Sequence, residues 1–183
     1  MRKRPIALSA AVALLALAGC SNEQPDTPLP PVRPVELPAA SAGGACILWD
    51  YPFIKQTIGV DFSVAASGQV DDTSTCVVQT TASQGPYLVL SVVESTKADG
   101  DLFLDELMPS KSTKVKGLGK AGYLLVTKAS GDHGPTVEIG WLSEADQLQT
   151  LQFTFAKEAK TKDIEPMRTK LLALAKAMNT TNG

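Results

Sequence analysis

Residues 148–157, LQTLQFTFAK, show the most regular alternation of apolar and polar side chains in the chain. Leu151, Phe153 and Phe155 recur at every second position, which is the period of a strand with one buried face and one face in water. Four other segments are rich in β-branched or aliphatic residues and end at turn residues: 75–81, 87–95, 123–130 and 136–143. The pattern therefore predicts a sheet of about five strands.

The links between consecutive strands are short and rich in turn-forming residues. ASQGP (82–86), GDHGP (131–135) and EADQ (144–147) are the three examples. Because links of this length join neighbouring strands as hairpins, we expect the strands to pair antiparallel.

Three segments instead repeat their apolar residues at helical spacing. The first lies within 46–59 and ends at Gly59, and the second lies within 100–110. The third is the C-terminal segment 162–179, for which Asp163 is the expected N-cap. The expected fold class is therefore α+β: an antiparallel sheet of about five strands packed by helices, including a C-terminal helix.

The N-terminus has the pattern of an export signal. The cationic start MRKRP precedes thirteen residues, 6–18, of which only Ser9 is polar. Thirteen residues are too few to span a hydrocarbon core of roughly 30 Å, but they suit the apolar part of a secretory signal. We therefore expect residues 1–19 to be a signal peptide. The four residues 17–20, which end in a cysteine, indicate the signal peptide of a lipoprotein.

This segment, Leu17-Ala18-Gly19-Cys20, resembles the bacterial lipobox. The resemblance implies that Cys20 receives a diacylglycerol and becomes the first mature residue. Two acyl chains at ~0.8 kcal/mol per buried methylene anchor a protein stably. The membrane is thus the expected partner, through acyl chains on Cys20, with the domain on the extracytoplasmic face of the cell membrane. In a Gram-negative cell, Ser21 would permit onward transport to the outer membrane.

Residues 20–44 are expected to be an acylated cysteine followed by a tether. Six prolines fall between Ser21 and Gly44, and they favour extended polyproline conformations that bury no core. A spacer that holds the domain away from the membrane is the preferred interpretation. A proline-rich ligand for a partner domain is the alternative.

Composition limits what the remaining residues, 45–183, can be. About 139 residues suit a single extracytoplasmic α+β domain. Removing Arg2, Lys3 and Arg4 from the seventeen basic residues leaves fourteen against nineteen acidic ones, a net charge of about −5. Such a surface repels phosphate backbones on average, so we expect no nucleic-acid partner.

Cys46 and Cys76 remain once Cys20 is assigned to the anchor. Exported chains meet an oxidising environment, so this even pair predicts a disulfide. A metal site is not expected, because the two cysteines are 30 residues apart and the chain has a single histidine.

No pattern identifies a catalytic reaction, and no cofactor is expected. His133, the only histidine, sits in the GDHGP turn beside Asp132, where adjacent residues do not orient one another as a triad requires. The acidic residues of 99–106 lack the spacing of a calcium loop and fit helix capping. Residues 116–122, KGLGKAG, lead into a strand rather than into the helix that a phosphate loop requires.

Trp49, Tyr51 and Trp141 are the candidate ligand-binding residues. Aromatic side chains serve apolar clefts as well as cores, so packing is the alternative role for each of them.

The whole pattern resembles a group of actinobacterial cell-envelope lipoproteins that carry a domain of unknown function. The resemblance rests on the lipobox, the proline-rich spacer, Cys46 and Cys76, the Ile58-Gly59 helix end and the segment 117–124, GLGKAGYL. It covers roughly residues 46–178. It implies an extracytoplasmic domain of sheet and helices and carries over no catalytic residues.

The leading expectation is a non-enzymatic module, anchored to the membrane, that binds a ligand such as a lipid or glycan, or an envelope protein. Two alternatives stay open. A cell-envelope hydrolase would need a nucleophile, a base and an orienting group within hydrogen-bond reach. A structural subunit of an envelope secretion or transport complex would need no such cluster.

Overall fold

The computed structural model describes residues 37–81, 85–94 and 97–181. The expected signal peptide, Cys20 and the tether up to residue 36 lie outside these residues. Val35–Gly183 forms one compact unit, and it contains every helix and strand described below.

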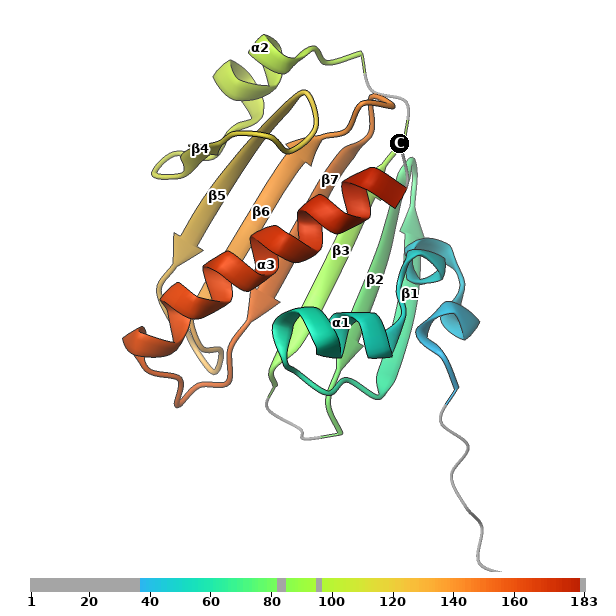
Figure 1. The fold of residues 1–183 in the computed structure, drawn as a ribbon, viewed down its shortest axis with the longest axis vertical. Helices are drawn as coiled ribbons and strands as arrows, with labels where there is room; N and C mark the ends of the chain where they lie inside the picture. Colours follow the sequence, from blue (N-terminus) through green and yellow to red (C-terminus); the bar gives the residue numbers. More distant parts are fainter. Residues whose placement is uncertain (1–36, 82–84, 95–96, 182–183) are drawn as a thin grey trace, which may run out of the picture. The chain divides into compact units, whose positions relative to one another are not determined.

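A single antiparallel sheet of seven strands organises this unit (Figure 1). The strand order is β1-β2-β3-β7-β6-β5-β4. The strands are β1 (Val64–Val70), β2 (Thr73–Gln79), β3 (Tyr87–Val93), β4 (Thr113–Val115), β5 (Ala121–Thr127), β6 (Thr136–Leu142) and β7 (Leu148–Thr154). The mixed helix and sheet class and the antiparallel pairing are confirmed. The expected count of about five strands is wrong, because β1 and β4, the two edge strands, were not anticipated.

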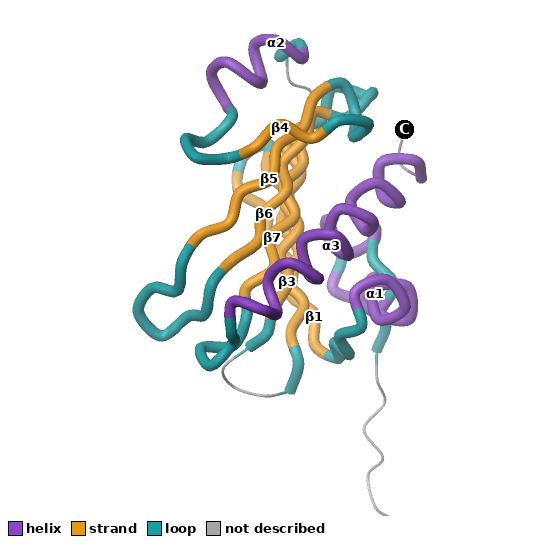
Figure 2. Tube along the Cα trace, turned by 60° about the vertical axis from the view of Figure 1, so that its left-hand side comes forward, coloured by secondary structure: helices purple, strands orange, loops and turns teal. Residues whose placement is uncertain are grey.

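Helices cover the two faces of the sheet unequally (Figure 2). The helices α1 (Tyr51–Ile58) and α3 (Thr161–Thr181), with the 3₁₀ turns η1 (Ala39–Ala42) and η2 (Gly44–Leu48), pack on what we call the helical face. Of the helices in the described part of the chain, α2 (Gly100–Leu102) and the π turn η3 (Phe103–Leu107) lie on the opposite face, the open face, near one end of the sheet. The expected C-terminal helix is thus present as α3.

The main core lies between the sheet and α1 and α3 because alternate strand residues point to the helical face. Leu90 on β3 pairs with Leu151 on β7, which pairs in turn with Ile139 on β6, and all three are fully buried. Leu171 and Leu174 of α3 belong to the same buried cluster. The alternation along 148–157 therefore corresponds to a real division between faces.

The helix ends follow the capping rules with one difference from expectation. Gly59 ends α1 in the left-handed conformation, with φ of 79°, as expected. The short helix before residue 110 is capped by Asp99, whose Oδ1 accepts a bond from the Leu102 N–H at 2.8 Å. Asp163 is not the N-cap of α3, which begins at Thr161; its carboxylate accepts a bond from the Lys160 N–H at 3.0 Å.

The folded part begins before the boundary expected at residue 45. Ala39, in η1, is fully buried, and the Ser67 hydroxyl donates a hydrogen bond of 2.5 Å to the Ala42 carbonyl. The expected disulfide joins Cys46 in η2 to Cys76 in β2, with 4.9 Å between the Cα atoms, and both cysteines are fully buried. The bond therefore ties the N-terminal turns, rather than α1, to the sheet.

Candidate functional site

The three aromatic candidates do not form one cleft. Trp49 and Trp141 are buried in the main core, at 4% and 0% exposure. Tyr51, at the start of α1, lines a hollow of about 500 Å³ together with Leu37, Lys55 and other residues near the entry of the chain. Packing is thus the observed role of both tryptophans, and Tyr51 is partly buried and packs against the same core.

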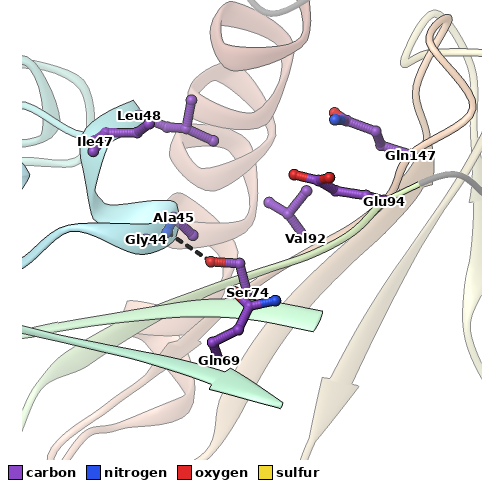
Figure 3. A pocket seen from close by; sticks show the side chains of 9 residues that line it. All are labelled: Gly44, Ala45, Ile47, Leu48, Gln69, Ser74, Val92, Glu94 and Gln147. Atoms are coloured by element: carbon purple, nitrogen blue, oxygen red, sulfur yellow. Dashed lines mark hydrogen bonds between the residues drawn. The ribbon is translucent and has the colours of Figure 1, made fainter. Parts of the chain in front are cut away.

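A second hollow lies on the helical face, between η2 and the ends of β1, β2 and β3 (Figure 3). We call it the η2 hollow; its volume is about 450 Å³. Its lining residues are mostly small, aliphatic or neutral polar: Gly44, Ala45, Ile47, Leu48, Gln69, Ser74, Val92, Glu94 and Gln147. Among the described residues that line it, Glu94 is the only charged one, so the hollow suits a ligand that is largely uncharged.

The turn η2 forms one wall of the η2 hollow, and local bonds hold this wall in place. The Ala45 N–H donates a hydrogen bond of 2.9 Å to the Ser74 hydroxyl (Figure 3). The neighbouring Cys46 is held by its disulfide. A Cβ on Gly44 would lie 3.1 Å from the same hydroxyl, and Gly44 has φ of 52°. A glycine is needed there because both the close approach and the positive φ disfavour a side chain. This wall is therefore held in place before any ligand arrives.

Gln147 connects the η2 hollow to a buried polar pair. Its Oε1 accepts a hydrogen bond of 3.0 Å from Nε2 of Gln149, which is 2% exposed. Trp141 lies directly opposite Gln149 on β6. Within the described part of the chain, neither Oε1 of Gln149 nor Nε1 of Trp141 has a hydrogen-bond partner. Buried polar atoms are nearly always bonded, so these two atoms are exceptions, although neither residue itself lines the hollow.

The open face carries a hydrogen-bonded carboxylate. Glu138 on β6 accepts bonds from the Tyr123 hydroxyl at 2.8 Å and from Nε2 of Gln152 at 2.9 Å. Burial raises the pKa of Tyr123, and the hydrogen bond to Glu138 raises it further. Tyr123 is therefore a donor here rather than a nucleophile, since its anion is strongly disfavoured.

A stacking contact with Phe103 also holds the Tyr123 ring in place. The Phe103 ring of η3 stacks on it, with centroids 5.9 Å apart and an angle of 24° between planes. Beside this stack lies a hollow of about 190 Å³, lined in part by Leu107, Tyr123 and Leu148. The size is small for an organic ligand, and the arrangement serves to fasten η3 to the sheet.

The other residues considered in the sequence occupy structural positions. His133 is exposed in its turn, and its Nδ1 lies 2.9 Å from the Tyr87 hydroxyl. Asp132 pairs instead with Lys157, at 2.9 Å. In the glycine-rich segment, a Cβ on Gly119 would lie 2.9 Å from the Leu142 carbonyl carbon, so this glycine lets the chain pass close to β6.

The lining of the η2 hollow was missed by sequence reasoning. Gln69, Ser74 and Gln147 are neutral polar residues spread over almost eighty positions, and no motif connects them. Glu138, by contrast, could have been singled out from the sequence as a candidate site residue. It is the only acidic residue in the mostly apolar strand TVEIGWL.

Two features are absent from the part of the chain that the structure describes. In 37–81, 85–94 and 97–181, no helix is both long and apolar enough to cross a membrane. The same residues hold no group of three or more histidine, cysteine, aspartate or glutamate side chains placed to bind a metal ion. Comparison with known proteins adds no relative: no family model, curated protein or solved structure matches the chain.

Proposed function

We propose that the protein is a bacterial lipoprotein, anchored through Cys20, whose domain binds a small, largely uncharged amphiphilic molecule of the cell envelope in the η2 hollow. The proposal assigns no catalytic step to the domain. The anchor rests on the lipobox and the signal pattern of residues 1–19.

The η2 hollow is the observation that carries the binding role. Its volume of about 450 Å³ falls within the roughly 300–1,000 Å³ typical of small-molecule sites. Ile47, Leu48 and Val92 supply apolar walls, while Gln69, Ser74 and Gln147 supply amide and hydroxyl groups. Sites of this kind take an apolar body and orient it through a few hydrogen bonds.

A comparison of two adjacent valines tests the site. Val92 lines the η2 hollow and is 5% exposed, whereas Val93, the next residue of β3, points to the open face. Val92→Phe should fill part of the hollow and abolish binding, and Val93→Phe should leave binding intact. Native mass spectrometry of the purified chain, incubated with lipid and glycan extracts of the bacterial envelope, would measure the bound mass. Equal binding by the two variants would refute this location.

The anchor is tested separately. Cells that express the full chain and receive a fatty-acid probe should label the wild-type protein and not a Cys20→Ser variant. Failure to label the wild type would remove the anchor from the proposal and leave the binding experiment unaffected.

A further inference from the structure

The two edges of the sheet differ in how well they are protected (Figure 1). At one edge, β4 has only three residues, contains Lys114 and is flanked by Lys111 and Lys116. Short, lysine-rich edge strands resist pairing with another chain. At the other edge, β1 has seven residues, VAASGQV, with neither charge nor proline. The β1 edge therefore lacks the usual protection.

The outward backbone groups of β1 follow from its hairpin. Val70 pairs with Thr73 across a two-residue turn, so these two residues exchange hydrogen bonds with each other. Alternation along the strand then directs the N–H and C=O groups of Ala65, Ser67 and Gln69 away from β2. None of the hydrogen bonds of the described residues ends on these outward groups.

The edge is also accessible and apolar at both ends. Six of the seven β1 residues are exposed, all but Ala65. Val64 and Val70, the first and last residues, are 40% and 72% exposed and point to the open face. The turns η1 and η2 pack against β1, where the Ser67 hydroxyl bonds to the Ala42 carbonyl, while Ala66 and Gly68, which point to the open face, are exposed.

We propose that β1 pairs antiparallel with β1 of a second copy of this chain, around a two-fold axis at Ser67. This register places Ser67 opposite its own equivalent, Ala65 opposite Gln69, and Val64 opposite Val70. The three outward residues of each copy face the three outward residues of the other. Each outward residue donates one bond and accepts one, so the pairing forms six backbone hydrogen bonds.

The sequence of β1 is what favours a second copy over an unrelated strand. Reading outward from Ser67, two small or polar residues come first in each direction and a valine closes each end. A two-fold interface must be complementary to itself, and this strand meets that condition with exposed valines in contact at both ends. β1 itself carries no charge, so no like charges lie directly opposite each other at its seven paired positions.

A proline at an outward position tests the pairing without breaking the β1–β2 hairpin. Gln69→Pro removes an outward N–H, which proline tolerates at an edge, and Gln69→Thr is the matched control that keeps it. Sedimentation velocity of the chain from Ser21 to Gly183 should show a dimer that forms with rising concentration for the wild type and Gln69→Thr. Gln69→Pro should raise the dissociation constant about tenfold or more. Equal dimerisation by both variants, or a wild type that stays monomeric at all concentrations, would overturn the proposal.

Cysteine cross-linking in cells tests the register with the full chain. Ala66 lies opposite Gly68 of the second copy, at a Cα separation of roughly 4.5–5.5 Å that a disulfide spans. Ala66 lies about 8 Å from its own equivalent, which is too far. Co-expression of Ala66→Cys and Gly68→Cys chains should give a cross-linked dimer, and Ala66→Cys alone should not. A side chain at Gly68 meets open space, so that variant should fold. Cross-linking by Ala66→Cys alone, or none in the mixture, would exclude this register.

Discussion

Gly140 is a position where one added methyl group should have a large local effect through contact with a single side chain. It lies directly opposite Tyr123 in the β5–β6 pair, and the Tyr123 ring lies across it. A Cβ on Gly140 would sit inside van der Waals contact with that ring, 2.6 Å from the hydroxyl oxygen. The ring cannot move away freely, because Phe103 stacks on it and Glu138 holds its hydroxyl.

The expected cost of Gly140→Ala has two parts. Overpacking in a constrained site costs roughly 1–3 kcal/mol. Displacement of the ring also weakens the bond to the Glu138 carboxylate, and bonds to charged groups contribute about 1.5–3 kcal/mol at most. Because Glu138 is half-buried, we expect the lower part of that range and a total loss of about 3 kcal/mol. For a domain of this size, the melting temperature should fall by about 10 °C.

Chemical denaturation of four chains separates the steric effect from strand propensity. The chains are the wild type, Gly140→Ala, Tyr123→Ala and the double variant. Removal of the Tyr123 ring opens the space, so Gly140→Ala should cost less than about 0.5 kcal/mol in the Tyr123→Ala background. Gly68→Ala in β1, where a Cβ meets no atom within 4 Å, is the control for replacing a strand glycine.

The double-mutant cycle can refute this account directly. If Gly140→Ala costs the same with and without the Tyr123 ring, contact with that ring is not the cause. A cost in Gly68→Ala as large as in Gly140→Ala would point instead to a general effect on the strand.

Three further predictions use the same unfolding measurements. Replacing Cys46 and Cys76 together by alanine should lower the free energy of unfolding by about 3–4 kcal/mol, because the disulfide closes a loop of 30 residues; a change below about 1 kcal/mol would contradict this. Above pH of about 10, the unfolded chain loses the Tyr123 proton first, since folding raises the pKa of that hydroxyl, so stability should fall with rising pH. Tyr123→Phe should flatten that fall, and an unchanged slope would count against the shift. Gly119→Ala should destabilise by more than about 2 kcal/mol, because its φ of 55° and the approach to Leu142 both exclude a side chain; near-neutral stability would be the contrary result.

The sequence predicted the elements whose side chains divide cleanly between core and water. The strand at 148–157, the helix end at Gly59 and the C-terminal helix all have this property. β1 lacks it, because only Ala65 of its seven residues is even partly buried, and pairing with β2 rather than side-chain packing defines the strand. β4 is three residues long and has no residue that is fully buried, so it leaves no periodic signal.

The candidate site was less predictable than the fold, for a physical reason. The η2 hollow forms because β3 pairs with β7, which brings Gln147 near Val92 and Glu94. That pairing joins segments about sixty residues apart, and nothing local in either strand specifies it. The tryptophans were attractive candidates because of their size, and the same size explains their burial in the core.

The seam between β3 and β7 also bears on how the chain can be divided. On one side lie α1 and the three strands of the first meander, and on the other lie the four strands of the second meander and α3. The core crosses the seam, since Leu90 meets Leu151 and α1 contacts α3. Neither half alone can bury all of its apolar residues. Within each half, however, the strands that are consecutive in sequence are also neighbours in the sheet. A chain cut between β3 and α2 should therefore give two fragments that fold only when they bind each other, as in fragment complementation. The folding of either fragment would then report that the other is present.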